Sequence, residues 1–238
     1  MINCEWGIDG INKFSSQSEI TIIVDVLSFS TCVDIALSQK AIVYPYVYKD
    51  DSAIDYAAAN DAVLASFNRS KDKFSLSPLS LKKISEGTRI VLPSPNGSEL
   101  SLCSLSKVTL CACFRNYRLV AEYANSISEN IVVIPAGEKW PNGTMRFAIE
   151  DYLGAGALLS ELKGELSAEA NAAKKLFESL KQDLKHIISG SLSGRELIEK
   201  GFPEDVDIAL ELNAGRSVPV LKNKCFVNAG NHFNFSNS

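Results

Sequence analysis

Residues 19–34 read EITIIVDVLSFSTCVD, and this stretch decides the fold class. The continuous β-branched run over residues 19–26 is typical of a buried strand. An acid, Asp25, stands where this strand ends, and residues 31–38 are predicted to form the helix that follows. A buried strand that leads directly into a helix is the repeating unit of α/β proteins.

The same alternation continues through the first two thirds of the chain. Repeated strand and helix patterns favour an α/β fold built on a mostly parallel, doubly wound sheet. Further strands are predicted at residues 41–48, 62–66, 89–93, 108–113 and 131–135, and further helices at residues 51–60, 78–85, 98–105, 116–127 and 148–162.

The last third of the chain is richer in helical patterns, so we expect an α/β part over residues 1–150 and a helix-rich part over residues 151–238, with a soft boundary. Ser193 and Glu196 have the spacing of a helix capping box. The Asn-rich tail is expected to fray. The patterns predict a long helix at 168–188, a helix opening at 193, a helix at 203–212, a closing hairpin or edge strand at 218–221 and 225–227, and the tail at 228–238.

The composition excludes several classes of protein. Hydrophobic residues make up 46% of the 238 residues, which is too many for a disordered chain. The net charge is −4 and the basic residues are scattered, which argues against a nucleic-acid partner. No secretory signal opens the sequence and no apolar run could cross a bilayer, so we expect a cytoplasmic protein without a membrane partner. Six cysteines without a C-x-x-C pair indicate buried, reduced thiols rather than a zinc site.

Polar residues follow several of the predicted strands. In open α/β sheets ligands bind at the carboxyl ends of the strands, so these positions are candidates for the site. Asp25, Glu150 and Asp151 carry the hard oxygen ligands that Mg²⁺ takes in proteins. Capping of the following helices is the competing explanation for these acids.

Two strand-to-helix turns could bind an anion. Ser30-Thr31 and Asn96-Gly97 stand where backbone N–H groups at a helix start face outward, and glycine allows a close approach. Ordinary N-capping explains them equally well. The chain contains neither G-x-x-x-x-G-K-[ST] nor G-x-G-x-x-G, and it also lacks the G-x-S-x-G of serine hydrolases.

Six short blocks, taken in order, resemble the 2-phosphosulfolactate phosphatase family over nearly the whole chain. The resemblance implies a three-layer α/β/α arrangement of two α/β parts. It also implies Mg²⁺-dependent hydrolysis of 2-phosphosulfolactate to 3-sulfolactate and phosphate, a step of coenzyme M biosynthesis. The blocks are DVLSFSTCVD (25–34), PSPNGS (93–98), CFRN (113–116), PAGE (135–138), EDYLGAG (150–156) and SGRELIEKGFPEDV (193–206).

The resemblance also assigns roles to residues. Asp25, Glu150 and Asp151 are expected to be catalytic and to hold Mg²⁺, whose charge would stabilise the phosphoryl group in transfer. The substrate is expected to be a small phosphorylated carboxylic or sulfonic acid. Its proposed binding residues are Ser28, Ser30, Thr31, Asn96, Gly97, Arg115, Asn116, Gly137 and Arg195.

Two departures from the family pattern bear on the substrate. Ser28 stands where the family has an arginine, and residues 68–78 are shorter than the family's glycine-rich loop. Arg69 could replace the arginine of that loop, and Arg115, Arg146 and Arg195 could also supply the missing cation. Two alternative functions therefore stay open: a silent, ligand-binding descendant and a phosphatase for another 2-phospho acid. The mechanism is also open, between direct attack by water and covalent attack by Asp25. A homodimer is also left open.

Overall fold

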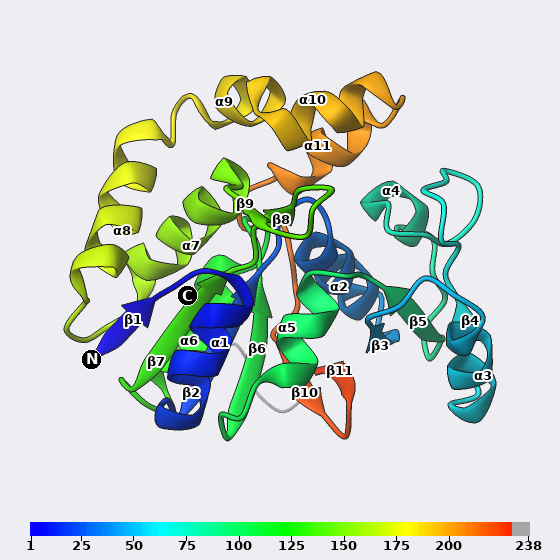
Figure 1. Ribbon diagram of the computed structural model, residues 1–238, viewed down its shortest axis with the longest axis horizontal. Coiled ribbons are helices and arrows are strands. Elements are labelled where there is room, and N and C mark those ends of the chain that lie inside the picture. The colour runs from blue at the N-terminus through cyan, green and yellow to red at the C-terminus, as the bar shows by residue number, and fades with distance from the viewer. Residues whose placement is uncertain (230–238) are drawn as a thin grey trace.

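The computed structural model describes residues 1–229 and has an α/β fold with helices on both faces of a mixed sheet, as the sequence predicts (Figure 1). Within the described residues the sheet has nine strands in the order β1-β7-β2-β6-β10-β11-β3-β5-β4. These strands are β1 (Ile2–Cys4), β2 (Ile20–Val24), β3 (Ile42–Tyr46), β4 (Val63–Leu64), β5 (Arg89–Pro93), β6 (Val108–Ala112), β7 (Ile131–Pro135), β10 (Pro219–Lys222) and β11 (Cys225–Asn228).

Within residues 1–229 the helices flank the sheet (Figure 1). They are α1 (Gly7–Phe14), α2 (Phe29–Ser38), α3 (Ser52–Ala59), α4 (Pro78–Leu81), α5 (Gly97–Cys103), α6 (Tyr117–Asn125), α7 (Ile149–Glu161), α8 (Ala168–Leu180), α9 (Leu184–Gly190), α10 (Leu192–Glu199) and α11 (Pro203–Ala209). A small antiparallel pair, β8 (Glu138–Lys139) and β9 (Met145–Arg146), follows β7. None of the helices in residues 1–229 combines the length and apolarity needed to cross a membrane.

Pairing in the sheet is parallel on either side of an antiparallel hairpin. Strands β1, β7, β2 and β6 pair in parallel, and so do β3, β5 and β4. The β10–β11 hairpin joins the two sets through antiparallel pairs with β6 and β3. The predicted closing hairpin is therefore confirmed, and its strands occupy the middle of the sheet.

Alternation of side chains along the strands builds the layers. Ile22 and Val24 of β2 pack with α6, α7 and α8, whereas Ile23 packs on the other side with Ile11 of α1 and Leu100 of α5. Successive residues of a strand point to opposite faces, so a run of buried β-branched residues fits a strand covered on both sides. The β-branched run that opened the sequence therefore lies at the centre of the core.

Three local predictions differ from the structure. The helix expected over 168–188 is interrupted between α8 and α9, and the apolar spacing of Phe177, Leu184 and Ile188 continues across this break, which hid it from the periodicity. The cap of α10 is Ser191, whose Oγ accepts the Gly194 N–H at 3.0 Å, so Ser193 lies inside the helix. The three-residue strand β1 was too short for a pattern to reveal.

The ends of the chain and the thiols complete the comparison with the sequence. Asn228 belongs to β11, and the remainder of the tail expected to fray, residues 230–238, lies outside the described residues. All six cysteines are unpaired. Four are buried as expected, whereas Cys103 is exposed and Cys225 is partly exposed.

Candidate active site

A cavity of about 340 Å³ lies where β2, β5 and β7 end. In Figure 1, α9, α10 and α11 lie together over this end of the molecule, beyond the β8–β9 hairpin. The walls of the cavity therefore combine strand ends of the sheet with helices that come much later in the sequence. The cavity is lined by Asp25, Leu27, Ser28, Lys49, Phe67, Asn68, Arg69, Leu76, Ser94, Pro95, Asn96, Glu138, Ser193, Glu196, Leu197, Lys200 and Phe202.

Asp25 is the buried acid at the end of β2. Its Oδ1 accepts the Phe29 N–H at 3.2 Å and its Oδ2 accepts the Gly97 N–H at 3.0 Å. Burial raises the pKa of Asp25 to about 7, with Glu138 and Glu150 adding to the rise and the two backbone N–H groups opposing it. An acid with a pKa near neutrality can exchange protons at physiological pH, which is the requirement for a general base.

Glycine at position 97 is required by this contact. A Cβ at this position would clash with the Phe29 ring and would come within 2.9 Å of the Asp25 Oδ2. The backbone N–H of α5 can therefore reach the carboxylate only because residue 97 has no side chain.

Asp151 repeats the same arrangement in the first turn of α7. Its Oδ1 accepts the Val26 N–H at 2.7 Å and its Oδ2 accepts the Gly137 N–H at 3.0 Å. Burial, followed by Asp25 and Glu150, raises its pKa well above the usual range. Gly137 has a φ of +69°, a left-handed conformation that glycine adopts without strain. Through these two hydrogen bonds Asp151 links the chain that follows β2 to the chain that follows β7.

Glu150 lies beside Asp151 and is 3% exposed. Burial raises its pKa and so does Glu138, while a hydrogen bond from Ser193 and the charge of Arg146 oppose the rise. Arg146 is itself buried and donates from Nη1 to Glu196 at 2.9 Å, while its Nε is without a hydrogen-bond partner in the described structure. The β8–β9 hairpin and α10 are thereby joined next to Glu150.

Glu138 adds a carboxylate that we did not select from the sequence. It accepts a hydrogen bond from Asn96 Nδ2 at 2.8 Å and raises the pKa of Asp25. Its position in the P-A-G-E block, directly after β7, was a signal that could have identified it. Asp25, Glu138 and Glu150 therefore form a cluster of acids whose negative charges oppose one another.

This cluster fits a hard cation such as Mg²⁺ in its chemistry. Its donors are carboxylates, and burial raises the pKa of Asp25 and of Glu150, with the charge of Glu138 adding to both rises. Among residues 1–229, no group of three or more His, Cys, Asp and Glu side chains stands ready to hold a metal ion by itself. That is compatible with Mg²⁺, which usually takes one or two carboxylates and completes its shell with water and phosphate oxygens.

Three cations also line the cavity, namely Lys49, Arg69 and Lys200. Lys49 lies at the rim after β3, and its pKa is lowered by desolvation and by the nearby charge of Arg69, against an opposing effect of Glu138. Arg69 donates from Nη1 to Asp205 at 2.6 Å and from Nη2 to the Ser28 Oγ at 3.1 Å. Lys200 reaches the cavity from the end of α10. Acids and cations therefore line the same cavity.

The residues predicted from the sequence divide into groups. Asp25, Ser28 and Asn96 line the cavity, and Glu150 stands next to it. Gly97 and Gly137 contribute backbone N–H groups that hold Asp25 and Asp151.

Ser30 and Thr31 stabilise the turn between β2 and α2. The Ser30 hydroxyl accepts the Asp25 N–H at 2.9 Å, and the Thr31 hydroxyl donates to the Val26 carbonyl at 2.7 Å. Both side chains are fully buried, and neither contributes to the lining of the cavity. A role for these two residues in binding phosphate stays a prediction.

The remaining predicted residues have other partners in the structure. Arg115 pairs with Asp34 and Glu211 in a buried ion network. Asn116 accepts the Cys113 N–H at 2.9 Å, and Arg195 is exposed and donates to the Gly190 carbonyl at 2.8 Å. These three residues also lie outside the cavity lining, and their proposed contacts with substrate stay predictions.

Arg69 was a candidate from the sequence, whereas Lys49, Lys200 and the contribution of α10 to the cavity were missed. Ser193, Glu196, Leu197 and Lys200 recur every three to four positions, which places them on one face of α10. That periodicity identifies a face, but only the fold shows which surface the face covers.

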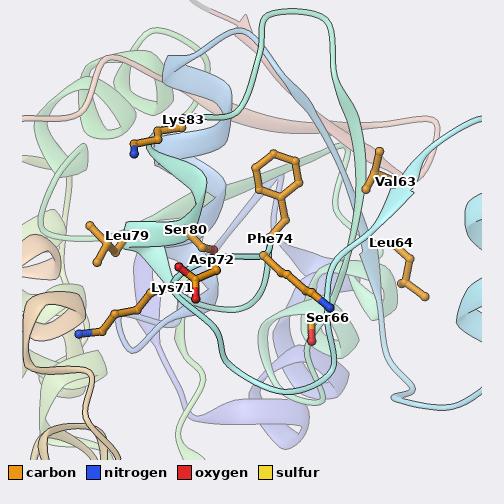
Figure 2. Close-up of a pocket in the computed structure, with 10 residues that line it drawn as sticks. Val63, Leu64, Ser66, Lys71, Asp72, Phe74, Leu79, Ser80 and Lys83 are labelled. Carbon is orange, nitrogen blue, oxygen red and sulfur yellow. The ribbon is translucent and has the colours of Figure 1, made fainter.

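A larger cavity, of about 900 Å³, lies between α4 and β4, and Figure 2 shows Phe74 projecting between these two elements. The charged side chains around it, Lys71, Asp72, Lys73 and Lys83, are exposed, and Lys71 pairs with Glu204. Asp25, whose pKa burial raises to about 7, lines the smaller cavity, and Glu150 stands next to it, so the smaller cavity is the better candidate site.

Comparison with known proteins identifies the family of this chain. The family model described as 2-phosphosulpholactate phosphatase matches residues 9–224. The chain is 32% identical over 216 residues to the probable 2-phosphosulfolactate phosphatase of Thermotoga maritima, covering 89% of this chain and 92% of the relative. It is 32% identical over 211 residues to the 2-phosphosulfolactate phosphatase of Methanothermobacter thermautotrophicus, covering 86% and 88%. Matches of this extent show that the chain belongs to the 2-phosphosulfolactate phosphatase family.

Proposed function

We propose that this protein is a Mg²⁺-dependent phosphatase that hydrolyses 2-phosphosulfolactate to 3-sulfolactate and phosphate. The observation that carries the proposal is that Asp25 and Glu138 line the same cavity as Lys49, Arg69 and Lys200. A substrate with a phosphate, a carboxylate and a sulfonate needs cationic partners, and its phosphoryl group needs compensation of developing charge. The names of the family and of its relatives point to the same substrate.

In this proposal Asp25 and Glu150 hold Mg²⁺, with Glu138 able to join them. When bound, the ion supplies positive charge against the phosphoryl oxygens of the substrate. Both oxygens of Asp151 accept backbone N–H groups, and this supports a role in which Asp151 fixes the strand ends that carry Asp25 and Glu138.

Two routes for the phosphoryl group stay open. In one, water attacks phosphorus, Asp25 accepts the proton of that water, and the bond to the ester oxygen breaks. In the other, the Asp25 carboxylate attacks phosphorus and forms an acyl phosphate, which water then hydrolyses. Acid quenching during turnover of labelled substrate distinguishes the routes, because only the second leaves label on the protein at residue 25.

The proposal is tested with purified protein, 2-phosphosulfolactate and MgCl₂, by measuring phosphate release. Asp25→Asn is expected to lower kcat by about 10²- to 10⁴-fold, the range that a positioned acid or base contributes. Asp55→Asn, in an exposed acid of α3, is the matched control and is expected to keep the wild-type rate. Equal rates for Asp25→Asn and wild type would refute the assignment of Asp25.

Ser28 supports a second candidate function. It stands where the family pattern has an arginine, and it is a small residue in the cavity wall. A small side chain there suits either a phosphatase for another small 2-phospho acid or a protein that binds such an acid without turnover. A panel of 2-phospho acids separates these cases, because only the second gives binding with no phosphate released from any member.

A further inference from the structure

We propose that Asp205 is a positioning residue that acts through Arg69. Its buried carboxylate holds the Arg69 guanidinium at the cavity wall so that Arg69 binds an acid group of the substrate that is not transferred. This inference rests on the proposed function, because it takes the cavity as the site that binds the substrate.

Asp205 is a buried acid, and the hydrogen bonds described for its side chain all come from residues 69–79. It lies in the first turn of α11 and is 1% exposed. Its Oδ2 accepts the Arg69 Nη1 at 2.6 Å, and its Oδ1 accepts the Ser77 hydroxyl at 2.7 Å and the Leu79 N–H at 3.3 Å. A buried charge is retained only when it is paired and hydrogen-bonded, and Asp205 meets both conditions.

Arg69 connects this acid to the cavity. Its Nη2 donates to the Ser28 Oγ at 3.1 Å, and its guanidinium lies 5.7 Å from the centre of the Phe202 ring. Ser28, Arg69 and Phe202 all line the cavity. The guanidinium is therefore fixed on two sides and against a ring. Its other N–H groups make no hydrogen bond with residues 1–229, so a ligand can accept from them.

The geometry distinguishes Arg69 from the other cations of the cavity. Lys49 and Lys200 end in flexible ammonium groups that act as point charges. A planar guanidinium can instead bind a carboxylate or sulfonate through two parallel hydrogen bonds, provided that the plane is oriented correctly. Asp205 supplies that orientation, and it does so from a helix more than a hundred residues away along the chain.

Asp205→Asn tests this arrangement because asparagine keeps an oxygen for Ser77 and Leu79 but loses the charge that holds Arg69. Binding is measured by calorimetry in MgCl₂ with two probes, namely 3-sulfolactate and inorganic phosphate. We expect the Kd of 3-sulfolactate to rise about tenfold and the Kd of phosphate to change much less. Asp207→Asn, an exposed acid of the same helix that pairs with Lys185, is the matched control and should leave both values as in wild type.

A double-mutant cycle separates positioning from a general structural effect. If Asp205 acts through Arg69, adding Asp205→Asn to Arg69→Gln weakens 3-sulfolactate binding no further than Arg69→Gln alone. Additive losses, or equal losses for 3-sulfolactate and phosphate, would overturn the proposal. If Asp205→Asn does not fold, Arg69→Lys replaces it, since lysine keeps the charge but cannot join Asp205 to Ser28. Wild-type binding by Arg69→Lys would equally refute the need for orientation.

The two proposals fail in different ways. Absence of phosphate release from 2-phosphosulfolactate by the wild-type protein refutes the proposed function. The binding measurements need no turnover, so they decide the role of Asp205 whatever the outcome of the activity assay.

Discussion

Asp25→Asn should stabilise the metal-free protein at alkaline pH while it lowers kcat. Burial and the neighbouring acids raise the pKa of Asp25 from 3.8 to about 7. A pKa unit corresponds to about 1.4 kcal/mol, so ionisation of this buried carboxyl costs the native state on the order of 4 kcal/mol. Asparagine has nearly the same shape and carries no charge, so the variant avoids this cost.

The hydrogen bonds reduce the expected gain. Asp25 accepts the N–H groups of Phe29 and Gly97 through its two oxygens, whereas asparagine has a single oxygen and an amide nitrogen that cannot accept. One buried N–H then loses its partner, at a cost of about 1–3 kcal/mol. The net stabilisation expected at pH 8 is therefore about 1–3 kcal/mol.

The pH dependence carries the sign of the effect. Below pH 3.8 the carboxyl is protonated in both folded and unfolded protein. As the pH rises towards 7 the unfolded chain has released its proton and the native protein has not, so native stability falls until the folded pKa is passed. Between pH 5 and pH 8 wild type should lose about 2–3 kcal/mol through this group, and Asp25→Asn should not.

Urea unfolding followed by circular dichroism, in EDTA at pH 5 and pH 8, measures this difference. Asp55→Asn is the control, and its free energy of unfolding should lie within about 0.5 kcal/mol of wild type at either pH. The reasoning is refuted if the difference between Asp25→Asn and wild type is the same at both pH values. That result would mean that Asp25 ionises in the folded protein with its ordinary pKa.

Three further predictions follow from the same contacts. Gly97→Ala should destabilise the protein by about 1–3 kcal/mol and reduce kcat, because the new Cβ would meet Phe29 and Asp25, whereas Gly190→Ala, with open space around its Cβ, should be tolerated in the same unfolding and rate assays. Arg115→Gln should cost about 3–5 kcal/mol in urea unfolding because it leaves Asp34 buried and unpaired, and a rise in KM without that loss would instead support substrate binding by Arg115. Adding MgCl₂ to the EDTA-treated protein should raise its melting temperature at pH 8 through the acid cluster, and a shift of equal size in Asp25→Asn would contradict the role of Asp25 in binding the ion.

Local signals in the sequence account for the parts of the molecule that were predicted well. The β-branched run before Asp25 and the strand before Asn96 each depend on neighbouring residues alone, and both side chains lie at the cavity. Their convergence follows from the rule that parallel strands end at the same edge of a sheet. Asp25 and Asn96 could therefore be placed together before the fold was known.

Long-range contacts account for what was missed. Arg69 reaches the cavity through Asp205, which is 136 residues away in the chain, and no periodic pattern encodes such a pairing. Glu138 stands on a two-residue strand whose partner is Arg146, and this hairpin was too short to recognise from alternation. The Arg69–Asp205 pair, Lys49 and Lys200 were thus invisible to local reasoning, although Asp25 and Glu150 were not.

The two buried aspartates show why a costly arrangement of charge can persist at this site. Asp25 and Asp151 each accept a pair of backbone N–H groups, and the charge of Asp25 raises the pKa of Asp151. Hydrogen bonds of this kind favour the ionised form, whereas burial and mutual repulsion oppose it. The pKa of Asp25 therefore lies near neutrality, and a divalent cation bound beside it would favour its ionised form. A cluster in this balance is a poor device for stability but a good one for binding a cation together with an anionic substrate, and this is the physical reason to place the phosphatase chemistry here.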